Sequence, residues 1–113
     1  MAVVQKADGT VVCERCVVAD SAWTRSKGLL GRSSLDEAEG ILLRPGGSIH
    51  MFFMRFPIDA VFLDDELRVL RIAADLKPWR MASKRGAKSV LELPAGLCVR
   101  AGVREGDRLI LES

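Results

Sequence analysis

The sequence has few of the side chains that bind metals or carry out nucleophilic chemistry. It has no tyrosine, a single histidine (His50) and three cysteines in 113 residues. An odd number of cysteines argues against the disulfide framework of small secreted domains. A zinc site with four nitrogen or sulfur ligands would have to recruit His50 and all three cysteines. We therefore expect no metal and no other cofactor.

Long apolar runs are also missing. No stretch approaches the roughly 18 consecutive apolar residues of a membrane-spanning helix, and the apolar start at residues 1–4 is too short for a signal peptide. We therefore expect a cytoplasmic protein that does not enter a membrane. The formal net charge of +2 is too small to indicate a nucleic-acid partner. Residues 77–88 hold five basic residues and no acidic one, a pattern typical of a solvated loop and, less often, of an anion-binding patch.

The remaining composition, 49% hydrophobic and 28% charged, is that of a globular domain. Residues 1–9 form an N-terminal segment that ends in the turn signal Asp8-Gly9, and residues 10–113 form a single β-rich domain. The pattern predicts a helix from residue 20 or 21 to residue 30 and a short helical turn between residues 96 and 102. It predicts strands at 10–19, 41–43, 48–53, 58–63, 68–73, 89–93 and 108–112. The fold class is mainly β (α+β), a compact small barrel or sandwich.

The most informative segment is 49–63, which holds His50, Arg55 and Asp59 inside the most apolar stretch of the chain. All four phenylalanines and two of the four methionines lie in the same stretch. Burying an unpaired charge is costly, so these polar groups must pair with one another or lie where a ligand can pair them. The segment therefore predicts a site, although it does not name a reaction.

Two interpretations of Asp59 follow from the bend expected at Pro57, which would bring Arg55 and Asp59 together. In the structural one, a buried Arg55–Asp59 pair fixes the bend and satisfies amides at the strand ends. In the functional one, Asp59 orients a ligand hydroxyl, or holds His50 in one tautomer for acid–base chemistry near neutral pH.

Trp79 and Arg80 lie in an irregular basic stretch between two predicted strands. A tryptophan usually fills a core with its N–H satisfied. If it is exposed, Trp79 can stack on a sugar or base while Arg80 or Arg25 grips an anionic group. The candidate ligand-binding residues are His50, Met54, Arg55, Asp59, Trp79 and Arg80.

The cysteines permit several interpretations. Cys13-Glu14-Arg15-Cys16 has the spacing of a metal-binding knuckle or a redox pair. Residues i and i+3 of a regular strand face opposite ways, so the two thiols meet only if the strand turns or bulges. Ordinary strand cysteines are the interpretation we favour over zinc or redox chemistry. Cys98 would need His50 beside it to act as a nucleophile, so we expect a core cysteine.

The ordered motifs of the chain resemble a known family. Gly28-Leu29-Leu30-Gly31-Arg32, Gly40-Ile41-Leu42-Leu43 and Phe53-Met54-Arg55-Phe56-Pro57-Ile58-Asp59-Ala60-Val61-Phe62-Leu63 are followed by Pro78-Trp79, Val90-Leu91-Glu92-Leu93-Pro94-Ala95-Gly96 and Gly106-Asp107. This arrangement resembles the family called domain of unknown function 192, over about residues 10 to 112. The resemblance implies a compact β-barrel-like domain and no assigned activity.

The leading functional hypothesis is a small binding module for a polar or anionic small molecule, or for a polar segment of a protein partner. Its cleft would lie between the His50–Asp59 strands and the Trp79 loop. The alternative is an enzyme of the hydrolase or lyase type, with His50 as general base and Asp59 as the residue that orients it. A third reading is a purely structural or assembly domain, with Arg55 and Asp59 as internal scaffolding.

Overall fold

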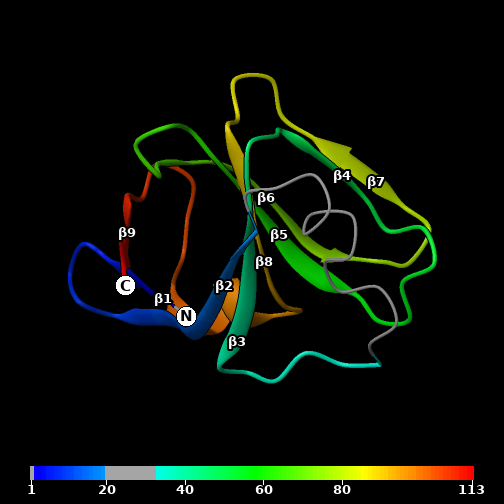
Figure 1. Cartoon of the computed structure of the whole chain (residues 1–113), viewed down its shortest axis with the longest axis horizontal. Helices are drawn as coiled ribbons and strands as arrows, with labels where there is room; N and C mark the ends of the chain where they lie inside the picture. Colours follow the sequence, from blue (N-terminus) through cyan, green and yellow to red (C-terminus); the bar gives the residue numbers. More distant parts are fainter. Residues whose placement is uncertain (1, 20–32) are drawn as a thin grey trace.

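The computed structural model describes residues 2–19 and 33–113, and nearly all of its regular structure is β-sheet (Figure 1). The described strands are β1 (Ala2–Lys6), β2 (Val11–Ala19), β3 (Glu39–Leu43), β4 (Ser48–His50), β5 (Ile58–Leu63), β6 (Val69–Leu76), β7 (Met81–Ser83), β8 (Ser89–Pro94) and β9 (Leu109–Glu112). The short helix α2 (Leu97–Ala101) follows β8. Seven strands form one sheet in the order β6-β5-β8-β3-β2-β1-β9, and β4 and β7 pair as a separate two-stranded ribbon.

The seven-stranded sheet curls until its two edge strands approach each other. A bridge between Arg68 and Arg108 joins the edges where β6 and β9 begin. The amide of Val69 donates to the Asp107 carbonyl, and the amide of Leu109 donates to the Leu67 carbonyl. These bonds leave the rest of the two edges apart, so the sheet is a partly closed barrel.

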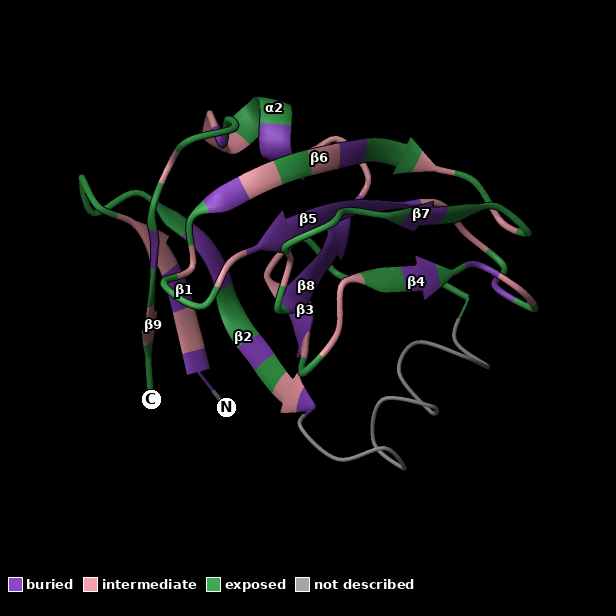
Figure 2. Ribbon diagram, turned by 90° about the horizontal axis from the view of Figure 1, so that it is seen from above, coloured by how far each residue is buried: buried purple, intermediate pink, exposed green. Residues whose placement is uncertain are grey.

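The two faces of the curled sheet bury two different cores. The inner core lies inside the curl and contains side chains such as Leu42, Val61 and Leu91. The outer core contains residues of the opposite face, such as Ala60 and Phe62, together with Ile49 and other residues of the β4–β7 ribbon and its loops. Figure 2 shows the central strands β3, β5 and β8 as almost wholly buried, which is what a sheet covered on both faces requires.

The predicted mainly β fold with a short helix near the C-terminus is confirmed, and β5 has the predicted bounds. The expected N-terminal segment 1–9 contains a strand, β1, which pairs with both β2 and β9. The turn at Asp8-Gly9 joins β1 to β2, with the Gly9 amide donating to the Lys6 carbonyl. The helix predicted near residues 20–30 lies outside the described residues. No helix among the described residues is long and apolar enough to cross a membrane.

Candidate functional site

Asp59 lies inside the barrel, and its carboxylate accepts hydrogen bonds from two backbone amides. Its Oδ1 accepts a hydrogen bond from the Asp75 amide at 2.9 Å, and its Oδ2 accepts one from the Cys98 amide at 3.0 Å. Asp75 lies at an irregularity in the β5–β6 register and has φ 51, so its amide is turned out of the ladder. Cys98 lies in the first turn of α2, where amides have no partner within the helix. Asp59 therefore joins a bulge to a helix start.

Neither Arg55 nor His50 is a partner of Asp59. Arg55 is exposed and makes no ion pair with any residue in the described ranges. His50 is exposed on β4, which pairs with β7 and not with β5. Its Nδ1 accepts the Phe52 amide at 3.3 Å, which leaves Nε2 to carry the proton of the neutral ring. His50, Arg55 and Asp59 are close in sequence, but they do not meet in the structure.

The structure instead brings His50 together with Trp79. The amide of Met51 donates to the Arg80 carbonyl, and the amide of Trp79 donates to the Met51 carbonyl. These bonds hold the loop after β4 against the loop before β7. The ring centroids are 4.8 Å apart for His50 and Phe52, 5.9 Å for Phe52 and Trp79, and 4.9 Å for Phe53 and Trp79. We call His50, Phe52, Phe53, Trp79 and Met81 the aromatic surface.

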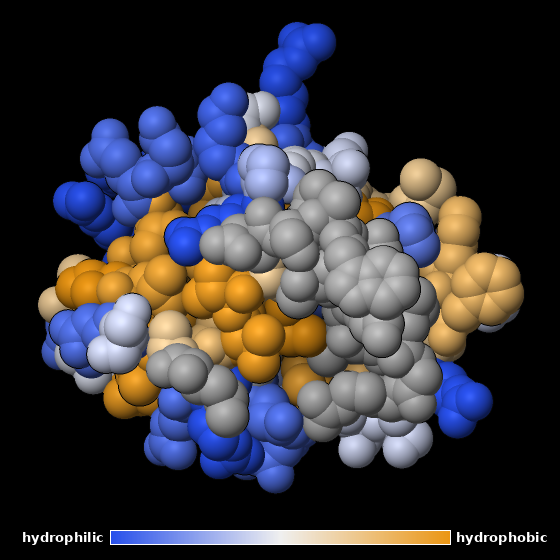
Figure 3. Space-filling model, in the orientation of Figure 1, coloured by the Kyte–Doolittle hydropathy of each residue, from blue (hydrophilic) through white to orange (hydrophobic). Residues whose placement is uncertain are grey.

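Three members of the aromatic surface are largely in solvent. Phe53 is 70% exposed, Trp79 58% and Met81 69%, and Figure 3 shows apolar side chains protruding where the chain leaves β4 and enters β7. Phe53 has φ 66 and Trp79 has φ 70. Bulky residues rarely adopt this left-handed region, and doing so costs on the order of 1 kcal/mol or more per residue. The fold therefore holds two aromatic residues in a strained backbone conformation while their side chains are exposed to solvent.

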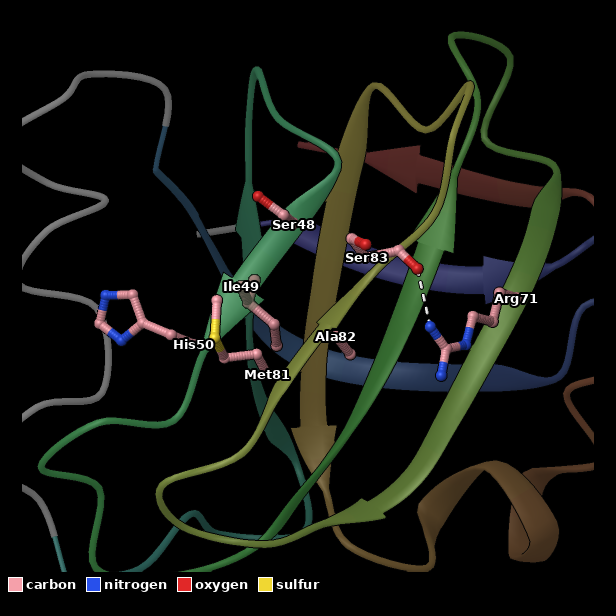
Figure 4. Close-up of a pocket in the computed structure, with 7 residues that line it drawn as sticks. All are labelled: Ser48, Ile49, His50, Arg71, Met81, Ala82 and Ser83. Carbon is pink, nitrogen blue, oxygen red and sulfur yellow. Dashed lines mark hydrogen bonds between the residues drawn. The ribbon is translucent and has the colours of Figure 1, made fainter.

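A hollow of about 400 Å³ adjoins the aromatic surface. Its lining residues come from the ribbon and from β6, and they are Ser48, Ile49, His50, Arg71, Met81, Ala82 and Ser83. Figure 4 shows that Arg71 reaches over to the ribbon, where its Nη1 donates to the Ser83 carbonyl at 2.7 Å. The hollow and the aromatic surface share His50 and Met81. No carboxylate is among the lining residues, whereas an arginine is.

The basic residues near the aromatic surface differ in their partners. Lys77 pairs with Asp75, with 2.6 Å between its Nζ and Oδ2. Arg80 is exposed and makes no ion pair with the residues that the structure describes. Met54, by contrast, is 8% exposed and belongs to the outer core. Of the six predicted ligand-binding residues, His50, Arg55, Trp79 and Arg80 are accessible, whereas Met54 and Asp59 are enclosed.

The Cys13–Cys16 pair converges, because the β1–β2 register shifts between Ala2 and Val4. A hydrogen bond between the two thiols lowers the pKa of Cys13 and raises the pKa of Cys16. Both thiols are free and buried in the inner core. Gly40 makes room for them, because a Cβ at this position would lie 2.9 Å from the Cys13 Sγ.

Cys98 is a third buried free thiol, and burial raises its pKa to about 12, with the Asp59 charge adding to the effect. Within residues 2–19 and 33–113, no three His, Cys, Asp or Glu side chains gather as metal ligands would.

Glu92 was not among the predicted site residues. It is 6% exposed, and burial raises the pKa of its carboxyl to about 7. The only sequence signal was its place in Val90-Leu91-Glu92-Leu93, where alternation suggests an outward side chain.

Comparison with known proteins places the chain among uncharacterised relatives. The model of the DUF192 family, described as an uncharacterised ACR, matches residues 3–111. A UPF0127 protein of Thermococcus sibiricus is 33% identical over 111 residues, which cover 94% of this chain and 71% of that protein.

Two solved structures have the same fold. A Novosphingobium aromaticivorans protein of unknown function has a TM-score of 0.82 and 28% identity, covering 96% of this chain and 82% of its own. A Sinorhizobium meliloti protein, proposed to be a transcription regulator, has a TM-score of 0.83 and 25% identity, covering 96% and 90% respectively.

Proposed function

The chain belongs to the DUF192 family of uncharacterised proteins, and we propose that it is a small binding module. Its ligand is a polar or anionic small molecule, or a polar segment of a protein partner. The ligand binds at the aromatic surface and in the hollow beside the ribbon. Asp59, which the sequence suggested as an anchor, stays outside this site, because both of its oxygens are engaged by backbone amides.

The observation that carries the proposal is the exposure of Phe53 and Trp79 beside a hollow that lacks a carboxylate. Exposed rings bind the flat faces of sugars and bases, and each stacked base contributes about 1–3 kcal/mol. Arg80 and Arg55 are exposed at the two loops that carry these rings, and guanidinium groups favour phosphate and carboxylate. The site is therefore suited to a ligand with a planar or sugar ring and an anionic group.

The enzymatic alternative has weaker support. A hydrolase or lyase built on His50 would need a partner to orient the imidazole, and the partner of Nδ1 is the Phe52 amide. A His50→Gln variant separates the two functions. Under the binding function it retains near-normal affinity at high pH, where the imidazole is neutral, whereas under the enzymatic function it loses turnover.

Tryptophan fluorescence tests the proposal directly. The chain has two tryptophans, so a Trp23→Phe background makes Trp79 the single reporter. The probes are nucleoside monophosphates, sugar phosphates and the matching nucleosides without phosphate. We expect saturable quenching by the phosphate-bearing probes, and we expect Phe53→Ala to weaken it about tenfold, as the loss of one stacked ring predicts.

Matched arginine variants test the anionic part of the ligand. Arg80→Ala should weaken binding of the phosphate-bearing probes, while Arg104→Ala, another exposed arginine, should not. A DNA duplex in the same assay examines the regulator function proposed for the Sinorhizobium protein. If no probe saturates, or if Phe53→Ala binds as tightly as its parent, the aromatic surface is not the binding site.

A cytoplasmic location is part of the same proposal. It is supported by the three cysteines of the described residues, all of which are free thiols, as is usual in reducing compartments.

A further inference from the structure

β9 is an edge strand whose outer side has no strand partner among the described residues. It pairs with β1 in a regular register from Leu109 to Glu112, and Figure 2 shows it at the margin of the sheet. The bridge between Arg68 and Arg108 lies just before β9 begins. The outer side of an edge strand is a template for the pairing of a further strand.

The alternation of the ladder shows which backbone groups of β9 point outward. Lys6 lies opposite Leu109, and the Lys6 amide donates to the Thr10 carbonyl and not to β9. The Leu109 amide likewise turns away from β1 and donates to the Leu67 carbonyl. In an antiparallel pair, every second residue points both of its polar groups away from the partner strand. Leu111 therefore points its N–H and C=O away from β1 as well.

Three of these outward groups have no hydrogen-bond partner within residues 2–19 and 33–113. The Leu67 amide donates to the Asp64 carbonyl, which leaves the Leu109 carbonyl unpaired. The N–H and the C=O of Leu111 are unpaired in the same way. We call these three groups the free edge of β9. A row of this kind matches the amides and carbonyls of an added strand.

A hollow of about 500 Å³ lies along the free edge of β9. Its lining consists of Ala7, residues 65–67 and residues 108–111. Leu67 and Leu111 are partly buried and pack against the inner core, so an apolar side chain placed beside them would extend that core. Leu67 has φ 64, a strained conformation for a bulky residue. The free edge is thus accompanied by space for the side chains of an added strand.

The charges around the hollow favour a basic ligand. Asp65 and Glu66 are exposed, and neither carboxylate makes an ion pair with the residues that the structure describes. Arg108, the basic residue of the lining, donates its Nε to the Glu66 carbonyl at 3.2 Å. A hydrogen bond from the Arg68 amide, together with the charges of Arg68 and Arg108, lowers the pKa of Asp64. Three carboxylates therefore face two arginines, and negative charge is in excess.

We propose that the free edge of β9 binds an extended peptide segment in which apolar and basic residues alternate. The backbone of the segment pairs with Leu109 and Leu111 and becomes an eighth strand of the sheet. Its apolar side chains lie against Leu67 and Leu111, and its basic side chains pair with Asp65 and Glu66. The lining of this site shares no residue with the aromatic surface or its hollow, so this proposal does not depend on the proposed function.

A second copy of the chain is a poorer occupant of the free edge. Its own β9 would bring Glu112 to an edge that already has Asp65 and Glu66, and like charges on neighbouring strands destabilise a sheet. Sedimentation of the free protein tests this alternative. A dimer that Leu111→Pro dissociates would overturn the peptide proposal, whereas we expect a monomer.

The first experiment titrates the peptide acetyl-Lys-Val-Lys-Val-Lys-amide into the protein and follows the amide chemical shifts. We expect saturable shifts at the amides of Leu67, Ile110 and Leu111. The matched peptide with glutamate in place of lysine should bind at least fivefold more weakly, because it loses the ion pairs and is repelled. Added salt should weaken binding of the lysine peptide.

Two N-methylated peptides test strand addition itself. In an extended chain the valine amides point to one edge and the lysine amides to the other. Methylating one set blocks pairing with β9, and methylating the other set leaves it intact. We therefore expect one of these peptides to bind at least tenfold more weakly than the unmodified peptide and the other to stay within about threefold of it.

Variants of the chain test the two parts of the site. Leu111→Pro removes the outward N–H, and proline is tolerated at a sheet edge where this group faces solvent. It should bind the peptide about fivefold more weakly than Leu111→Ala, which shortens the side chain but keeps the N–H. Glu66→Gln should weaken binding about threefold, whereas Glu105→Gln, at an exposed glutamate outside the lining, should bind like the parent.

Three results would overturn the proposal. They are the absence of saturable shifts at β9 in a folded parent, equal binding of the two N-methylated peptides, and equal binding of the lysine and glutamate peptides.

Discussion

Replacing Glu92 by glutamine should change how the stability of the free protein depends on pH. The carboxyl has a pKa of about 7 in the folded state, against an ordinary value of 4.5, because burial disfavours its charge. At 1.36 kcal/mol per pKa unit, this difference corresponds to about 3 kcal/mol. That is a large part of the roughly 5–15 kcal/mol by which a small domain is stable.

The sign follows from which state binds the proton more tightly. Since the folded pKa is the higher one, the folded state holds the proton between pH 4.5 and about 7, while the unfolded chain has released it. The Glu92 contribution is therefore most favourable below pH 4.5 and declines as the pH rises toward 7. Well above pH 7 both states have released the proton, and the Glu92 contribution to stability no longer changes with pH. Glu92→Gln has no ionisable group at this position, so its stability should not show this decline.

Urea unfolding of the parent and of Glu92→Gln, at several values from about pH 4 to about pH 8, measures the effect. The free energy of unfolding of the variant, relative to the parent, should rise by about 3 kcal/mol over this range. Burying the glutamine amide also has a free-energy cost, but this cost does not depend on pH and so does not affect the change with pH. Glu105→Gln, at an exposed position, should show no such trend. A relative change below about 1 kcal/mol, or one that favours the parent at high pH, refutes the burial argument.

Three further predictions concern other parts of the fold. Asp59→Ala should lower the free energy of unfolding by about 3–5 kcal/mol in urea titrations, because two buried amides lose a charged acceptor; a loss below about 1 kcal/mol would contradict this role. Phe53→Gly should change stability by less than about 1 kcal/mol, because relief of the left-handed strain offsets the lost ring contacts, and a larger loss would argue against strain. Cys13, Cys16 and Cys98, each at most 2% exposed, should resist iodoacetamide until urea is added; rapid labelling of the native protein, read by mass spectrometry, would contradict their burial.

The strands were predictable where apolar side chains alternate or run together, as in β5 and β8. β4 ends at His50 and not at Phe53, because Phe53 adopts a left-handed conformation that no strand continues through. β7 was missed because Met81–Ser83 has three residues and no pattern to detect. β1 was missed because its partners β2 and β9 include a strand more than 100 residues away.

The site was harder to predict than the fold, because it depends on which distant groups meet. The charges at Arg55 and Asp59 suggested a pair, but the partners of Asp59 are backbone amides of a bulge and of a helix, which have no side-chain signature. Glu92 was overlooked because alternation in a strand normally places a glutamate in water. Here the outer core covers that face, so the same alternation buries the carboxyl.

Stability alone does not explain Glu92, Phe53 or Trp79. Burying a carboxyl without a partner and holding two exposed aromatic residues at positive φ each destabilise the folded state, and no contact among the described residues offsets the buried carboxyl. Departures of this kind concentrate at binding sites, where strain and unpaired groups are kept for a ligand. Phe53→Gly should therefore weaken binding of the phosphate-bearing probes about tenfold without a marked loss of stability, and Glu92→Gln should be no less stable than the parent at high pH.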